Sequence, residues 1–208
     1  YLTGTHRTVP PEQTLNWITP KIEVIGVTRV ASITGLDRVG IPVYSCVRPR
    51  AADGAVSVYS GKGIVEVHAK VSAIMEAIER HSAEIKLEDQ QRMIKGSFKE
   101  LSSKCNVLNP SELILPSLTH YGPNTILRWI KGYDIIQNKE IFVPVSAVFH
   151  PYRPKDDLHL FRTNTNGLAS GNAIEEAVLH GLMETIERDA WSLTELTKAE
   201  REIIHVSH

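Results

Sequence analysis

Two short stretches of the chain carry the same pattern of carboxylates and a guanidinium group. Glu76 to Arg80 and Glu184 to Arg188 both read E-x-I-E-R, and an offset of 108 residues superposes them. In each copy the first Glu lies thirteen residues after a glycine, Gly63 or Gly171. Such self-similarity indicates an internal repeat of a glycine loop followed by a helix.

The repeat suits a polyphosphate that is bridged by metal ions. On the first predicted helix Val67, Val71, Ile74 and Ile78 project away from Glu76, so they are predicted to face the core. Small side chains flank the acidic face, which predicts that something approaches it closely. Leu179, Leu182 and Ile186 are the corresponding inward residues of the second helix. If the two acidic faces meet, four carboxylates repel one another unless cations lie between them. Mg²⁺ prefers such oxygen ligands together with substrate phosphates.

A candidate phosphate cradle precedes the first acidic helix. Ser60 to Gly63 reads S-G-K-G and supplies a cation, unhindered backbone N–H groups and a helix N-terminus. The spacing and the hydroxyl that define a P-loop are absent from this stretch.

Simpler interpretations stand beside these. A single E-x-x-E-R is typical of an i,i+4 ion pair on a solvated helix face, and the repetition is what favours a shared function. His180 with Glu184 and Glu187 also resembles the ligand set of helical di-iron proteins, but the first copy has Ser72 in place of His180. Four other histidines, His6, His120, His150 and His159, are assigned to surface or structural positions.

Composition narrows the class of protein. The 208 residues are 42% hydrophobic with a net charge of −1, which fits a globular chain and does not favour nucleic-acid or membrane binding. Cys46 and Cys105 form no C-x-x-C pair, as expected in a reducing compartment. The first residues lack the apolar run of a signal peptide. A cytoplasmic location is therefore predicted.

The remaining pattern predicts a mixed α/β fold. A short helix is expected from Pro10, followed by strands at Ile22 to Ile33 and Ile41 to Val47. A helix is expected within 64–95, an irregular surface excursion over 96–124, and a hairpin at 126–149 that continues the sheet. Asn172 is the predicted N-cap of the second repeat helix.

These motifs resemble the YcaO family. The resemblance runs from Ser60 to Arg80 (S-x-G-K-G, then A-x-x-S-A-x-x-E-A-x-E-R) and from Asn166 to Ala190 (N-G-x-A-x-G-N, then E-A-x-x-x-G-x-x-E-x-x-E-R-D-A). Gly4 to Arg7 and Pro11 to Leu15 resemble the N-terminal segment that contacts nucleotide in that family. The resemblance implies a mixed α/β fold with two repeated strand, glycine-loop and helix units packed on mixed sheets. It also implies one domain over 1–208 that lacks a C-terminal part.

The resemblance assigns roles to particular residues. It implies that ATP and Mg²⁺ are the cofactors and that a peptide-backbone amide oxygen is activated by phosphorylation. The implied metal-side residues are Glu76, Glu79, Glu176, Glu184 and Glu187. The implied ATP-binding residues are Arg7, Thr14, Lys62, Ser72, Arg80, Ala169, Asn172 and Arg188. The catalytic residues are expected in the missing C-terminal part.

Two branches of the family differ in the nucleophile that attacks the activated amide. External sulfide yields a thioamide, whereas an internal Cys, Ser or Thr yields an azoline ring. The first residues most resemble the stand-alone archaeal type, which is associated with TfuA partners and glycine thioamidation. The resemblance thus implies a peptide or protein substrate, a TfuA-like partner and a homodimer. An azoline-forming cyclodehydratase and a non-catalytic nucleotide-binding or scaffolding module are the alternatives.

Overall fold

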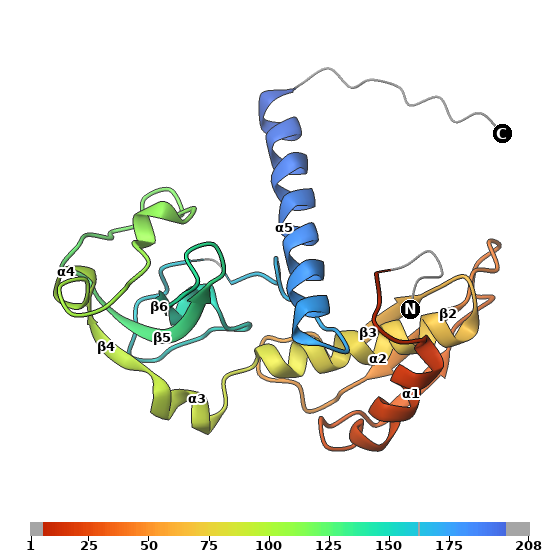
Figure 1. The fold of residues 1–208 in the computed structure, drawn as a ribbon. Coiled ribbons are helices and arrows are strands. Elements are labelled where there is room, and N and C mark those ends of the chain that lie inside the picture. Colours follow the sequence, from red (N-terminus) through yellow and green to blue (C-terminus); the bar gives the residue numbers. More distant parts are fainter. Residues whose placement is uncertain (1–5, 162, 199–208) are drawn as a thin grey trace. The chain divides into compact units, whose positions relative to one another are not determined.

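The structure is a computed structural model that describes residues 6–161 and 163–198 (Figure 1). It divides into two compact units, one formed by residues 11–165 and the other by residues 1–10 together with 166–208. Gly4 and Thr5 of the predicted nucleotide-contacting segment lie outside the described residues. The elements confirm a mixed α+β fold with five α-helices and two three-stranded antiparallel sheets in the described part of the chain.

A helix pair and the first sheet open the larger unit. The elements, in chain order, are α1 Pro11–Ile18, the 3₁₀ helix η1 Thr19–Lys21, β1 Arg29–Ser32, β2 Val43–Val47, β3 Val58–Lys62 and α2 Glu66–Ala83. Strand β2 is central and pairs antiparallel with both neighbours. The strand that was expected from Ile22 begins only at Arg29, because a turn intervenes in which Val27 N–H donates to the Ile22 carbonyl at 2.9 Å.

Helix α2 lies directly on strand β3 because the side chains that would separate them are absent. Ala69, Ala73 and Ala77 are fully buried. A Cβ atom on Gly61 would lie 2.2 Å from the Ala69 carbonyl oxygen and 2.1 Å from the Ala73 nitrogen. The small residues near the acidic face were expected to leave room for a ligand. Ala69 and Ala73 instead let strand β3 pack closely against the helix. Of the four residues predicted to face the core, only Ile74 is fully buried.

The first repeat helix is shorter than the sequence predicted. Helix α2 ends at Ala83, and Glu84 takes an extended backbone. The Nη2 atom of buried Arg48 donates to both Glu84 carboxylate oxygens, at 2.8 and 2.7 Å. The His150 N–H donates to the Ala83 carbonyl at 2.9 Å, which satisfies one of the acceptors that a helix end leaves open. The helix therefore ends where Arg48, which is distant in sequence, binds the Glu84 carboxylate. The residues around Glu84 gave no sign of this helix end.

A second antiparallel sheet fills the rest of the larger unit. Its elements, with the short helices beside it, are α3 Leu87–Arg92, β4 Ile94–Ser97, α4 Phe98–Leu101, η2 Pro110–Glu112, β5 Ile126–Asp134, β6 Lys139–Pro144 and η3 Val145–Ala147. The predicted hairpin is correct for β5 and β6, but it does not continue the first sheet. It pairs instead with β4, in the order β4-β5-β6. Trp129 is fully buried and its Nε1 donates to the Gly96 carbonyl at 2.9 Å.

The smaller unit is built on one long helix, α5 Ile174–Thr197. Residues 163–173 before it form no strand, so the second repeat lacks the strand that the resemblance implied. Leu179, Leu182 and Ile186 were expected to be inward-facing, but they are 37%, 43% and 61% exposed. In the described part of the chain, no helix combines the length and apolarity needed to span a bilayer.

Candidate nucleotide and metal site

The first E-x-I-E-R motif forms a compact charged cluster on α2. Arg80 Nη2 lies 3.4 Å from Glu76 Oε1, and Arg80 Nε lies 3.7 Å from Glu79 Oε1. The Glu76 side chain is 34% exposed and that of Glu79 is 13% exposed. One guanidinium group thus holds two carboxylates on one side of the helix and offsets part of their mutual repulsion.

The second motif repeats this pairing on α5. Arg188 Nη2 lies 3.5 Å from Glu184 Oε1, a geometry close to that of Arg80 and Glu76. The Gly167 N–H also donates to Glu184 Oε2, at 3.2 Å. Glu187 is exposed. The two copies of the motif therefore share the pairing of the first Glu with the Arg, each within its own unit.

The predicted phosphate cradle, Ser60 to Gly63, is not the open glycine loop that was expected. Ser60, Gly61 and Lys62 belong to strand β3 rather than to a loop. The Gly63 N–H donates to the Pro42 carbonyl at 3.2 Å, so it already has a partner. Both glycines are required by packing, because a Cβ on Gly63 would lie 2.3 Å from the His68 Cβ. Lys62, which is exposed at the end of the strand, remains available to an anion.

Glu176 anchors the N-terminal segment on α5. Its carboxylate is 1% exposed and accepts from Arg7 Nη1 at 2.8 Å. It also accepts from the Thr8 N–H at 3.0 Å, from the Thr8 hydroxyl at 2.9 Å and from Asn172 Nδ2 at 3.2 Å. Burial alone would raise the pKa of Glu176, but these hydrogen bonds outweigh it and lower the pKa to about 2. The metal-side role implied for Glu176 stays a prediction, beside a structural role that the sequence did not reveal.

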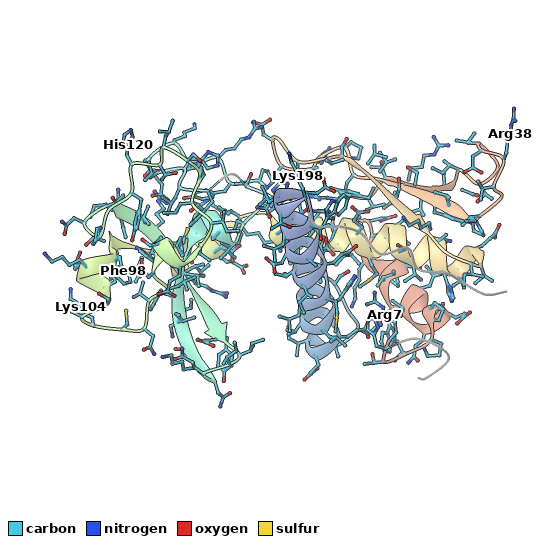
Figure 2. The ribbon with its side chains drawn as sticks, turned by 90° about the horizontal axis from the view of Figure 1, so that it is seen from above. Arg7, Arg38, Phe98, Lys104, His120 and Lys198 are labelled. Atoms are coloured by element: carbon cyan, nitrogen blue, oxygen red, sulfur yellow. The ribbon has the colours of Figure 1, made fainter. Side chains whose placement is uncertain are left out.

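Asn172 is not the N-cap of α5. The N-cap is Ala173, which makes no side-chain capping bond. The Asn172 amide is directed to the Glu176 carboxylate instead. Arg7, labelled in Figure 2, also approaches His180, with Nη2 3.5 Å from Nδ1. Asn172, just before α5, is therefore held by the Glu176 carboxylate and does not cap the helix.

The predicted site residues fall into two sets. The larger unit holds Thr14, Lys62, Ser72, Glu76, Glu79 and Arg80. The smaller unit holds Arg7, Ala169, Asn172, Glu176, Glu184, Glu187 and Arg188. Thr14 is buried on α1, whereas Ser72 is exposed on α2. Within the described residues, no group of three or more His, Cys, Asp or Glu side chains is arranged to hold a metal ion. The meeting of the two acidic faces stays a prediction.

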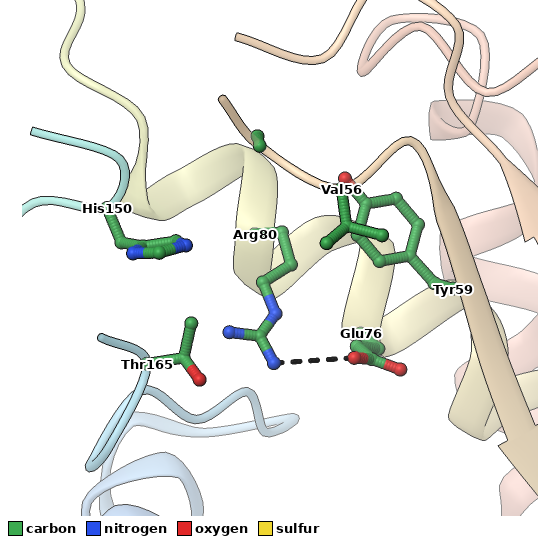
Figure 3. Close-up of a pocket in the computed structure, with 7 residues that line it drawn as sticks. Val56, Tyr59, Glu76, Arg80, His150 and Thr165 are labelled. Atoms are coloured by element: carbon green, nitrogen blue, oxygen red, sulfur yellow. Dashed lines mark hydrogen bonds and ion pairs between the residues drawn. The ribbon is translucent and has the colours of Figure 1, made fainter. Parts of the chain in front are cut away.

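The structure also reveals a pocket that the sequence did not indicate (Figure 3). It lies within the larger unit and is lined by Ala55, Val56, Tyr59, Glu76, Arg80, His150 and Thr165. His150 is seventy residues from Arg80 in sequence and carries no motif. Its hydrogen bond to the end of α2 brings it there, and no spacing rule could have found it.

Comparisons with known proteins identify relatives that match most of the chain. The family model described as YcaO cyclodehydratase, ATP- and Mg²⁺-binding, matches residues 60–207. An uncharacterized protein of Methanothermobacter thermautotrophicus is 52% identical over 188 residues, which are 90% of this chain and 47% of that protein. A protein encoded in the tfuA 3′ region of Rhizobium leguminosarum bv. trifolii is 37% identical over 199 residues, 94% of this chain and 45% of its own length.

A solved structure agrees with the sequence relatives. YcaO from Methanopyrus kandleri, bound with AMPPCP and Mg²⁺, is 31% identical with a TM-score of 0.77, and the match covers 100% of this chain and 51% of that one. The predicted cofactors, ATP and Mg²⁺, are those of the family description, and the bound ATP analogue and metal agree with them. The chain spans about half the length of each of these relatives.

Proposed function

The chain belongs to the YcaO family, and on that basis we propose that it binds ATP and Mg²⁺ for the phosphorylation of a peptide-backbone amide. The observation that supports this most is the repeated motif geometry. Arg80 pairs with Glu76 at 3.4 Å and Arg188 pairs with Glu184 at 3.5 Å, each on a helix of a separate unit. A duplicated acidic face of this kind suits more than one metal ion with a polyphosphate.

The side chains fit a magnesium–nucleotide complex in their chemistry. Carboxylate oxygens are the ligands that Mg²⁺ prefers, and Glu76, Glu79, Glu184 and Glu187 would hold it. None of these four is fully buried, so each retains access for a ligand. Bound Mg²⁺ would neutralise phosphate charge.

Lys62, Ser72 and Arg188 are exposed, and in our proposal they contact the nucleotide. Glu176 orients Arg7 toward α5, so it acts there as a positioning residue. Thr14, Ala169 and Asn172 complete the proposed nucleotide contacts. Glu76 and Glu79 already engage two nitrogens of Arg80, so only its Nη1 atom is left for a ligand.

Thioamide formation is the product that we favour. The balanced reaction converts a peptide C=O, ATP and sulfide into C=S, ADP and phosphate, with the amide oxygen leaving in the phosphate. The supporting observation is the relative encoded beside tfuA, at 37% identity. A TfuA-like protein is accordingly the proposed partner, and a glycine-containing peptide is the proposed substrate.

Azoline formation is the second candidate. The family model is described as a cyclodehydratase, and in that branch a Cys, Ser or Thr of the substrate attacks the activated carbon with loss of water. The two branches share the nucleotide chemistry and differ only in the nucleophile. Mass spectrometry of a peptide incubated with the protein that carries this chain, ATP, Mg²⁺ and sulfide distinguishes them.

We expect a mass gain of about 16 Da for the thioamide, whereas a loss of about 18 Da would indicate the azoline branch. Omission of sulfide should abolish the gain, and omission of the TfuA-like protein should reduce it. If neither product forms from peptides of both kinds while ATP still binds, the nucleotide-binding or scaffolding alternative replaces this proposal.

Nucleotide binding has its own test. Calorimetry of ATP should give tighter binding with Mg²⁺ than with EDTA. Glu76→Gln and Glu187→Gln should each weaken binding by about tenfold or more, whereas the exposed control Glu175→Gln on α5 should not. Equal binding in EDTA would contradict the metal bridge.

A further inference from the structure

The pocket in Figure 3 contains two buried polar atoms with no hydrogen-bond partner among the described residues. They are Arg80 Nη1 and His150 Nδ1. A buried polar group without a partner loses its hydrogen bonds to water without replacement, so native structures retain one mainly where a ligand or water satisfies it. Both atoms belong to residues that line the same pocket.

Each residue is held in place by other contacts. Arg80 uses Nη2 and Nε toward Glu76 and Glu79, which leaves Nη1 as the remaining donor nitrogen. The His150 backbone N–H donates to the Ala83 carbonyl at 2.9 Å, one turn beyond Arg80 on the same helix. The backbone of His150 and the guanidinium of Arg80 are therefore both anchored on α2.

The charge of the pocket does not favour an anion that carries no metal ion. Arg80 carries one positive charge, and two carboxylates already lie against it. Burial, and then the charge of Arg80, lower the pKa of His150 below its ordinary value, which favours the neutral form of its imidazole at pH 7. An anion that arrives without a metal ion would also approach Glu76, which lines the same pocket. A neutral ligand with one acceptor and one donor satisfies the two atoms without this repulsion.

We propose that this pocket binds the backbone of an extended peptide, whose C=O accepts from Arg80 Nη1 and whose N–H donates to His150 Nδ1. The C=O and N–H of one residue in an extended chain point to the same side, so one residue can supply both groups. Ala55, Val56 and the ring of Tyr59 form an apolar wall against which an adjacent side chain can pack. The inference rests on the proposed function and adds the place where the peptide substrate is held.

The test measures peptide binding apart from nucleotide binding. The probe is N-acetyl-glycyl-glycine methylamide, titrated into the protein that carries this chain while the His150 ring nitrogens are followed by NMR. We expect saturable shifts of these signals. Because His150→Phe and His150→Asn remove these ring nitrogens, the peptide affinity of the parent and of both variants is measured by calorimetry. His150→Phe should weaken binding about five- to tenfold, as expected for the loss of one hydrogen bond. His150→Asn, whose amide oxygen replaces the Nδ1 acceptor, should restore most of the affinity. His120→Phe is the matched control, at an exposed histidine labelled in Figure 2.

Inorganic phosphate is the competing probe. If phosphate shifts the His150 signals and the peptide does not, the pocket is an anion site and the proposal is wrong. If neither probe shifts them, the proposal is also wrong. Calorimetry of ATP with Mg²⁺ on the same variants distinguishes failure of the peptide pocket from failure of the proposed function. If ATP binds normally but the variants bind the peptide as the parent does, only the proposed peptide pocket is wrong.

Discussion

Replacement of Gly61 by alanine discriminates between two functions of the S-G-K-G stretch. If Gly61 is needed to let phosphate approach the backbone, Gly61→Ala should weaken ATP binding in a protein that remains folded. If Gly61 is needed to let α2 lie on β3, the substitution should destabilise the larger unit. The structure favours the second function, since Gly61 belongs to the strand and faces the buried alanines of the helix.

The expected loss of stability follows from the distances at Gly61. The added Cβ would lie 2.2 Å from the Ala69 carbonyl oxygen and 2.1 Å from the Ala73 nitrogen, whereas ordinary contacts begin at 3.4 Å. Both neighbours are backbone atoms, so no side chain can rotate away and the strand must move from the helix by about 1 Å. Overpacking a core usually costs about 1 to 3 kcal/mol. We expect a loss at the top of that range or above it.

Urea unfolding of the parent and the variant, followed by circular dichroism, measures this loss. Gly132→Ala in β5 is the matched control, because its Cβ would meet nothing closer than 3.6 Å, and we expect a change within about 1 kcal/mol. ATP affinity is then compared per folded molecule. Equal stability of Gly61→Ala and Gly132→Ala would refute the packing argument. A selective loss of ATP affinity in Gly61→Ala would return the stretch to the role of a phosphate cradle.

Three further predictions concern buried charged and thiol groups. Because hydrogen bonds lower the pKa of Glu176 from 4.5 to about 2, its contribution of about 3 kcal/mol is complete above pH 4.5 and is lost as the pH falls through 2. Hydrogen exchange in the first turn of α5 should therefore be faster in Glu176→Gln than in the parent at pH 6, and similar near pH 2. Arg48→Ala leaves Glu84, 13% exposed, without its cation and should cost about 3 to 5 kcal/mol in urea unfolding. Lys131→Ala, which breaks an exposed pair, should cost under about 1 kcal/mol, and equal losses would contradict the difference in burial. Burial raises the pKa of the Cys46 thiol to about 11, so iodoacetamide at pH 8 should leave it unmodified until urea unfolds the protein, as peptide mass mapping would show.

Sequence patterns were sufficient where the determinants are local. The start of α1 at a proline, the pairing of β5 with β6 and the helical register of both E-x-I-E-R motifs follow from neighbouring residues. They failed where a distant partner decides. Arg48 is thirty-six residues from Glu84. No periodicity in the sequence predicts that its guanidinium will bind Glu84 at the end of α2.

The small residues of α2 show a different limit. Alanines beside an acidic face are equally compatible with a ligand and with a closely packed strand, and only the position of Gly61 in β3 discriminates. Strand β4 was missed for a related reason. Its four residues, Ile94–Ser97, are too few to show an alternation. They pair with a strand that comes later in the chain, where the buried Trp129 lies opposite Ile94.

The differences between the two repeats are as informative as their similarity. At the offset of 108 residues, Glu176 corresponds to His68 and His180 corresponds to Ser72. Both α5 residues contact Arg7, whereas His68 and Ser72 are exposed on α2. The positions that are identical in both repeats therefore form the Glu–Arg pairs. The positions that differ, Glu176 and His180, bind the N-terminal segment through Arg7. This division explains why a second cationic side chain, Arg7, lies beside α5. Under the proposed function, that side chain gives the second acidic helix a phosphate-binding partner that the first helix obtains from Lys62.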